Sequence, residues 1–67
     1  MKELSEKIEE MNKACNGTLS ITHYPSGWNL HSYGDATVFS ERNYIYAETI
    51  VEVIEKAWAI YNERRSS

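Results

Sequence analysis

The chain has 67 residues and a formal net charge of −3, from ten acidic against seven basic side chains. This weakly acidic balance disfavours phosphate binding, which requires clustered Lys and Arg. A single cysteine, Cys15, excludes an internal disulfide and is typical of a reducing compartment. The length suits one domain over residues 1–67. No segment approaches the ~20 apolar residues of a membrane span, and the charged start of the chain is unlike a signal peptide.

The first predicted element is a helix over residues 2–15. Apolar side chains recur there at steps of three or four residues and form one narrow stripe: Leu4, Ile8, Met11 and Cys15. The opposite face is mostly acidic and holds two Glu–Lys pairs at the spacing of one helical turn: Glu3–Lys7 and Glu9–Lys13. Asn16-Gly17 then predicts the end of the helix, because glycine readily takes a left-handed backbone conformation.

Three strands are predicted next, over residues 18–23, 28–33 and 36–40. Pro25 and Gly27 mark the turn between the first two strands, and Gly34-Asp35 is a two-residue hairpin connection of the second and third. A glycine bulge at Gly27 is an alternative for the first turn, and it would oppose Tyr24 to Trp28.

The register follows from the two faces of the strands. If Leu30 opposes Ile21 on one side and Phe39 on the other, the apolar residues share one face: Leu19, Ile21, Trp28, Leu30 and Phe39. The same register opposes His31 to Val38 and Tyr33 to Ala36. The second face is then mostly polar: Ser20, Thr22, Asn29, His31, Tyr33 and Val38. We expect the first face to form the core.

The second predicted helix spans residues 49–61 and has the clearest periodicity in the chain. Thr49 and Glu52 form a capping box at its start. Its apolar arc is wide, with a central stripe and flanking positions: Ile50, Ile54, Ala57 and Tyr61, flanked by Ala47, Val51, Val53, Trp58 and Ile60. Such a helix should contact two surfaces, for instance a sheet and another helix. Residues 41–48 are compatible with a short further strand, an extended linker or the first turn of this helix.

The predicted fold class is therefore α+β: a two-layer α-β-β-β-α domain, in which a three-stranded antiparallel meander carries both helices on one face. Nothing in the sequence indicates catalysis. His23 and His31 fall on opposite faces of the predicted sheet, so one metal ion could not bind both. Cys15 lies on an apolar stripe, where a thiol is usually inert. The glycines are scattered turn residues, so there is no phosphate loop. We expect no catalytic residues, no metal and no cofactor.

The tyrosines are the strongest functional signal. The chain has five of them among eight aromatic residues, and not all can be buried in so small a core. Tyrosine is enriched in protein interfaces. We expect partner-binding residues on the acidic first helix or on the aromatic surface beside the sheet: Glu6, Glu9, Glu10, Tyr24, His31, Tyr33, Tyr44 and Tyr46.

Two resemblances follow from the order of elements and from one junction. The helix–three strands–helix order resembles a double-stranded-RNA-binding domain, but Glu48, Thr49 and Glu52 occupy the place where such domains are basic. RNA binding is therefore rejected. The stretch from Ile45 to Ile50, continuing to Glu52, is similar to a strand-to-helix junction found in small phage and prophage accessory proteins, including a phage inhibitor of bacterial RNA polymerase.

This second resemblance implies a phage-type protein that acts by binding in the cytoplasm of a host cell. The predicted function is non-enzymatic inhibition of a host protein, either a defence nuclease such as a CRISPR effector or the transcription machinery. The alternative is a structural or regulatory homodimer without an inhibitory target. No membrane partner is expected.

Overall fold

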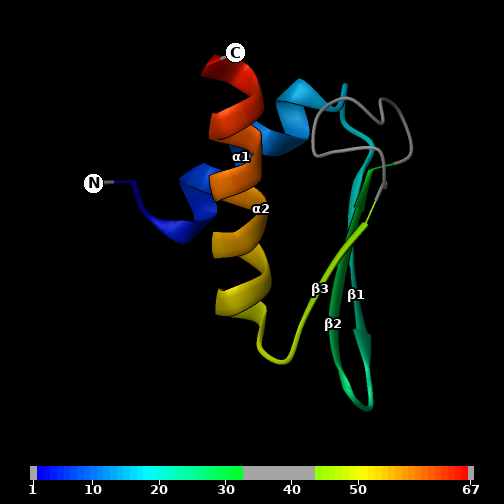
Figure 1. Ribbon diagram of the computed structural model, residues 1–67. Coiled ribbons are helices and arrows are strands. Elements are labelled where there is room, and N and C mark those ends of the chain that lie inside the picture. The colour runs from blue at the N-terminus through cyan, green and yellow to red at the C-terminus, as the bar shows by residue number, and fades with distance from the viewer. Residues whose placement is uncertain (1, 33–43, 67) are drawn as a thin grey trace.

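The structure, a computed structural model, describes residues 2–32 and 44–66. It contains helix α1 (Leu4–Ala14), strands β1 (Leu19–Tyr24), β2 (Gly27–Ser32) and β3 (Tyr44–Ala47), and helix α2 (Ile50–Ser66). The strands form one antiparallel sheet in the order β1-β2-β3. Both helices lie on one side of this sheet, and neither of them covers its other side (Figure 1). The predicted two-layer α+β fold is confirmed.

Helix α1 ends where the sequence predicts. Asn16 and Gly17 both have positive φ angles, 57° and 80°. This left-handed pair reverses the chain, so that the amide of Gly17 donates to the carbonyl of Asn12 at 2.8 Å. The apolar stripe is also confirmed, because Met11 and Cys15 are fully buried and Leu4 and Ile8 pack against the core.

The pairing of β1 with β2 has the predicted register. Ile21 opposes Leu30, and Tyr24 opposes Gly27 across the turn, so no bulge at Gly27 displaces the pairing. Leu30 is fully buried, and Leu19, Ile21 and Trp28 pack around the core on the same face. A two-residue turn, Pro25-Ser26, connects the strands.

The third strand of the sheet differs from the prediction. The second edge of β2 is paired with β3, where Ile45 opposes Leu30 and Tyr44 opposes His31. Since β1 occupies the first edge, Leu30 cannot pair with Phe39, nor His31 with Val38. Residues 36–40 themselves lie outside the described residues, as do Tyr33 and its expected partner Ala36. Of the three options for residues 41–48, the short further strand is the one that the structure shows for Tyr44–Ala47.

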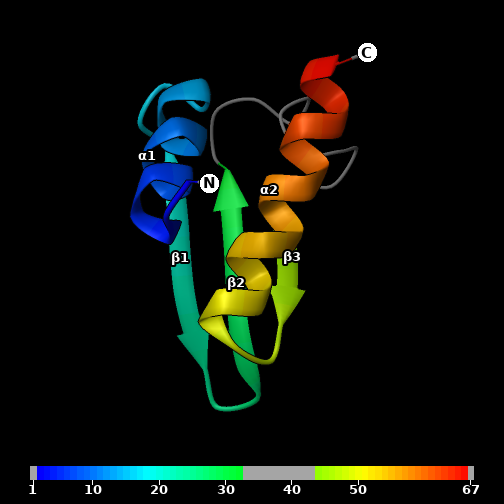
Figure 2. The ribbon, with the colours of Figure 1, turned by 90° about the vertical axis from the view of Figure 1, so that its left-hand side faces the viewer.

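Helix α2 lies beside α1 on the same face of the sheet, which it contacts at β2 and β3 (Figure 2). Its wide apolar arc therefore meets two surfaces, as expected. The buried centre of the arc is Val53, Ile54 and Ala57. Ile50, which the periodicity places on the central stripe, is 38% exposed, and Val51 is also exposed. Both side chains belong to the first turn of α2 and are only partly covered by the described residues.

The start of α2 is capped as predicted by Thr49. The Thr49 hydroxyl accepts a hydrogen bond from the amide of Glu52 at 3.1 Å. The return bond of the capping box is displaced by one residue, because the Glu52 carboxylate accepts from the amide of Glu48 at 3.4 Å. The helix continues beyond the predicted end, to Ser66.

Candidate functional site

Four of the eight predicted binding residues lie on the face of the sheet opposite α1 and α2. Antiparallel partners point to the same face, and side chains alternate along each strand. The register therefore places eight residues on the side of the sheet opposite the helices: Ser20, Thr22 and Tyr24 from β1, Gly27, Asn29 and His31 from β2, and Tyr44 and Tyr46 from β3. We call this set the outer sheet face. It lies opposite both helices in Figure 1.

Three tyrosines dominate the outer sheet face. Tyr24, Tyr44 and Tyr46 are 47%, 50% and 43% exposed. They come from the two outer strands, and the middle strand between them contributes the smaller Asn29 and the half-buried His31. Three half-exposed phenol rings on one side of a small sheet form an amphipathic surface of the kind enriched in protein interfaces.

One of these tyrosines is held in place by the turn of the hairpin. The Tyr46 hydroxyl donates a hydrogen bond to the Ser26 carbonyl at 2.5 Å, across the width of β2. Its ring passes over Gly27, whose missing side chain makes room for it. Aromatic cover of a strand glycine from a neighbouring strand is a known way to restore packing. Tyr46 therefore presents a fixed ring edge, at little further entropic cost on binding.

The outer sheet face is electrically neutral. None of the residues in β1, β2 and β3 is Asp, Glu, Lys or Arg, although a quarter of the whole chain is charged. The polar groups that it offers are hydroxyl, amide and imidazole groups from Ser20, Thr22, Asn29 and His31. Such a surface recognises a partner by shape and by neutral hydrogen bonds, with little long-range attraction.

The acidic residues of the predicted set lie elsewhere. Glu6, Glu9 and Glu10 belong to α1, on the helix side of the sheet, so they cannot share one contact surface with the tyrosines. They line a surface hollow together with Lys2 and Lys13. The structure thus separates the eight predicted residues into two groups and leaves Tyr33 outside the described residues.

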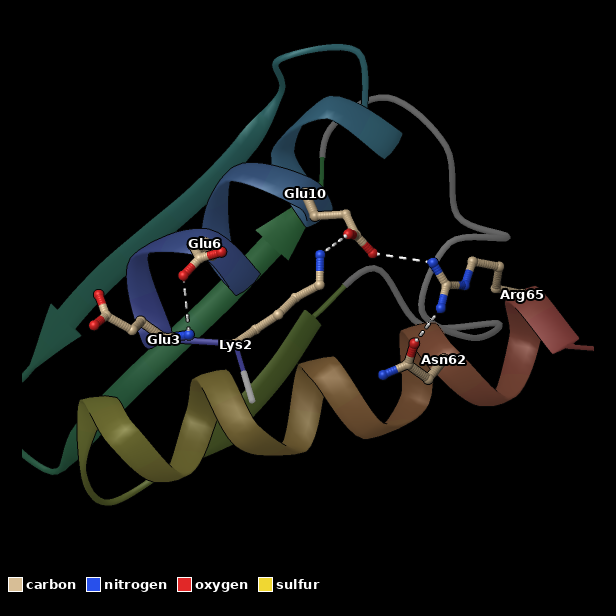
Figure 3. A network of polar contacts seen from close by, with 6 residues as sticks. All are labelled: Lys2, Glu3, Glu6, Glu10, Asn62 and Arg65. Atoms are coloured by element: carbon tan, nitrogen blue, oxygen red, sulfur yellow. Dashed lines mark hydrogen bonds and ion pairs between the residues drawn. The ribbon is translucent and has the colours of Figure 1, made fainter.

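Within the acidic group, Glu10 is engaged in contacts of its own chain (Figure 3). Its two carboxylate oxygens accept from Lys2 Nζ at 2.8 Å and from Arg65 at 3.1 Å. Arg65 also donates to the side-chain oxygen of Asn62 at 2.9 Å. Because Glu10 lies on α1 and Arg65 lies in the last turn of α2, their contact links the two helices.

The charges of this network stabilise each other. The hydrogen bond and the nearby charge of Lys2 lower the pKa of Glu10, with Arg65 adding to the effect. The same contact with Glu10 raises the pKa of Lys2. Glu6 is also used locally, because its carboxylate accepts from the amide of Glu3 at 3.4 Å. A structural role for Glu10 therefore competes with the predicted role in partner binding.

The contacts of Lys7 differ from the predicted pair with Glu3. Its ammonium group contacts Glu55 of α2 at 2.7 Å and lies near the Trp58 ring, instead of pairing with Glu3 along its own helix. The partly buried position of Lys7 between the helices places its ammonium group beside the Glu55 carboxylate of α2.

The two histidines lie on opposite faces of the sheet, as the register predicts. His23 is on the helix side, where its ring stacks on Trp28 with centroids 4.1 Å apart, whereas His31 belongs to the outer sheet face. Among residues 2–32 and 44–66, no group of three or more His, Cys, Asp or Glu side chains is arranged to hold a metal ion. Cys15 is a buried free thiol.

Sequence reasoning missed four members of the outer sheet face as site residues: Ser20, Thr22, Gly27 and Asn29. Ser20 opposes His31, Thr22 opposes Asn29, and Gly27 lies under Tyr46. For Ser20, Thr22 and Asn29 the signal was present, because strand alternation already placed them on the polar face. The sequence did not identify the third strand, which brings Tyr44 and Tyr46 to the same face.

Comparisons with protein-family models, with curated proteins and with solved structures found no match for this chain. Within the described part of the chain, neither helix combines the length and the apolar character needed to cross a membrane.

Proposed function

We propose that this chain is a non-enzymatic protein-binding domain that docks on its partner through the outer sheet face. The observation that carries the proposal is the display of three half-exposed tyrosines, Tyr24, Tyr44 and Tyr46, on one neutral sheet surface that neither α1 nor α2 covers. Buried tyrosine is a frequent source of binding energy at protein interfaces. Tyr46 is already fixed by the hairpin, which reduces the entropy lost on docking.

A protein partner fits this surface better than a nucleic acid does. Exposed aromatic rings on a sheet could stack on unpaired bases, but single-strand binding also relies on a positively charged groove. The strands of this domain contribute no Lys or Arg, and the chain is acidic overall. A partner with a neutral, partly apolar surface avoids both the missing cations and the repulsion between phosphates and carboxylates.

The proposed use of this binding is to block a host protein, such as a defence nuclease or a component of the transcription machinery. The support is the similarity of Ile45–Glu52 to the strand-to-helix junction of small phage and prophage proteins. In this chain the junction carries Tyr46 into the outer sheet face and Thr49 into the cap of α2. A phage-type protein of this kind would act in the host cytoplasm by occupying a surface.

The test is affinity capture from bacterial lysate with the tagged chain, at low and at high salt. We expect one stoichiometric partner, retained at high salt because the outer sheet face is neutral. A double variant, Tyr24→Ala with Tyr44→Ala, should weaken capture at least about tenfold, the effect of losing ~1.4 kcal/mol. The isolated partner should then lose activity when the wild-type chain is added.

Two control variants separate this surface from the others. Val51→Ala shortens an exposed apolar side chain of α2 that is not on the outer sheet face, and it should leave capture unchanged. Glu9→Lys reverses an exposed charge on α1. Capture that survives the tyrosine changes but fails with Glu9→Lys would contradict the proposal and assign binding to the acidic helix.

A further inference from the structure

Among the described strands, none pairs with the outer edge of β1. β1 is an edge strand, and in the described part of the chain β2 is the neighbour with which it pairs. Natural edge strands are commonly protected by charged side chains, proline or bulges. β1 has none of these within its six residues, LSITHY, and its pairing with β2 is regular.

The hydrogen-bonding groups of this edge follow from the hairpin. Tyr24 and Gly27 close a two-residue turn, so their backbone groups bond to each other. Alternation then directs the backbone groups of Thr22 and Ser20 toward β2 as well. The amide and carbonyl groups of Ile21 and His23 consequently point away from the sheet, toward the open edge.

At both ends of the edge, no amide hydrogen is available for pairing. The amide of Leu19, the next outward-pointing residue, donates to the side-chain oxygen of Asn12 at 3.1 Å. At the other end, Pro25 has no amide hydrogen to offer. The open edge therefore presents two amide donors, those of Ile21 and His23, together with the carbonyl groups of the same two residues.

We propose that β1 pairs with β1 of a second copy of this chain, antiparallel about a twofold axis that passes beside Thr22. In this register Ile21 opposes the partner's His23 and His23 opposes the partner's Ile21. Each pair exchanges two backbone hydrogen bonds, so the four bonds use the outward amide and carbonyl groups of Ile21 and His23 in both copies. Leu19, whose amide is occupied, opposes the partner's Pro25, which lacks a donor. The edge is complementary to itself.

The neighbouring register fits less well. A twofold axis at Ile21 would also keep each side chain on its proper face, but it would oppose Leu19 to the partner's His23. That pair requires the Leu19 amide, which already donates a hydrogen bond to the side-chain oxygen of Asn12. A shift by one residue would exchange the two faces of the sheet, and would bring apolar Ile21 to the polar side.

The charge and the shape of the domain are compatible with this pairing. The paired strands carry no charged residue, so two acidic chains meet along a neutral seam. In Figure 2, α1 covers the beginning of β1 and leaves the hairpin end uncovered. An antiparallel axis sets the covered end of one copy beside the uncovered end of the other. The result is a continuous six-stranded sheet that joins the two outer sheet faces.

The first test compares His23→Pro with His23→Ala by sedimentation equilibrium over a wide range of protein concentrations. We expect the wild type and His23→Ala to dimerise, because alanine keeps the outward amide while losing only the stack on Trp28. Proline removes that amide from both copies but keeps the bonds to β2, so dimer dissociation should rise roughly tenfold or more. Circular dichroism checks that His23→Pro remains folded.

The second test is disulfide trapping, which does not depend on the stability of a proline variant. Directly opposed residues at a non-hydrogen-bonded position bring their Cα atoms to ~4.5 Å, within disulfide range. Oxidised Thr22→Cys should therefore form a covalent dimer, whereas Ser20→Cys, which opposes the partner's Tyr24, should not. Cys15 is buried and stays apart from the edge.

A wild-type chain that sediments as a monomer at all concentrations, with no trapping of Thr22→Cys, would overturn the dimer. Dimerisation that is equal in His23→Pro and His23→Ala would place the interface on another surface and would also overturn it. Neither result affects the tyrosine-dependent capture, which tests the outer sheet face separately.

Discussion

Tyr46 crosses over Gly27 and bonds to the carbonyl of the turn residue before it. A Cβ atom built on Gly27 would lie 2.6 Å from both the Tyr46 hydroxyl and the Ala47 carbonyl oxygen. The contact joins the end of β3 to the β1–β2 hairpin, two segments that are distant in sequence. Gly27 thus determines both the packing of the sheet and the position of a tyrosine on the proposed binding surface.

Gly27→Ala should destabilise the domain by about 2 kcal/mol or more, because the backbone carbonyl of Ala47 cannot move aside without disturbing the pairing of β2 with β3. Gly17→Ala is the matched control. It also places alanine at positive φ, but into open space, and should cost about 1 kcal/mol. Urea unfolding followed by circular dichroism measures both. Equal losses would show that Tyr46 does not pack over Gly27.

Tyr46→Phe should keep the ring over Gly27 and remove the hydrogen bond to Ser26. The expected cost is about 1 kcal/mol of unfolding free energy, as for a single partly exposed hydrogen bond. Tyr44→Phe, on the same strand and the same face, should be nearly neutral to folding because Tyr44 is half exposed. A larger effect from Tyr44 than from Tyr46 in thermal unfolding would contradict the structure.

Leu30→Ala should be the most damaging of these substitutions. Leu30 is fully buried at the centre of the sheet, between Ile21 and Ile45. Its truncation should cost about 2–5 kcal/mol, which is a large part of the stability of a domain this small. Val51→Ala removes carbon atoms from a half-exposed residue and should change the unfolding free energy by less than about 0.5 kcal/mol. Urea denaturation compares the two.

Glu10→Gln should reduce the dependence of stability on acid pH. The lowered pKa of Glu10 means that the folded state favours the ionised carboxylate. Its contribution is therefore present above the pKa of the unfolded chain, near ~4.3, and is lost as the pH falls through the lower folded value. The stability difference between wild type and Glu10→Gln should shrink on acidification and in high salt.

The control for this experiment is Glu9→Gln, which lies on the same helix outside the Lys2–Glu10–Arg65 network. Thermal unfolding from neutral pH to pH 2 should show the pH-dependent difference for Glu10→Gln and no comparable difference for Glu9→Gln. A Glu10→Gln protein whose stability runs parallel to wild type at every pH would refute the network.

Thr49→Ala should lower the free energy of unfolding by about 1 kcal/mol, because the Thr49 hydroxyl caps the start of α2. It accepts a hydrogen bond from the amide of Glu52. Thr49→Ser keeps this acceptor and should recover most of the loss. Chemical denaturation measures both variants. If serine is as destabilising as alanine, the methyl group of Thr49 matters and the cap does not.

The local features of this fold were predictable because neighbouring residues determine them. Asn16-Gly17 ends α1 through its backbone preferences, and Thr49 starts α2 through its hydroxyl. The register of Ile21 with Leu30 follows from a two-residue turn and from side-chain alternation. Each of these depends on interactions within a few residues, or on a hairpin whose geometry the turn controls.

The third strand was not predictable in the same way. Residues 36–40 and the segment Tyr44–Ala47 both alternate in a manner suited to a strand, and each can reach the edge of β2. The structure selects Tyr44–Ala47, which buries Ile45 and Ala47 against Val53 and Ile54 of α2. That choice depends on how the start of α2 packs over the sheet, which local preference does not encode.

The sequence by itself determined the fold class, the first hairpin, the helix caps and the presence of more tyrosine than a small core can bury. Only the tertiary structure decided where those tyrosines meet. Tyr24 and Tyr46 are distant in sequence, and they share a face because β3 pairs with β2 in one register. Tertiary packing likewise assigned Glu10 to Arg65 and Lys7 to Glu55. A side chain's partners depend on which segments the core brings together, and periodicity reports only which way each side chain faces.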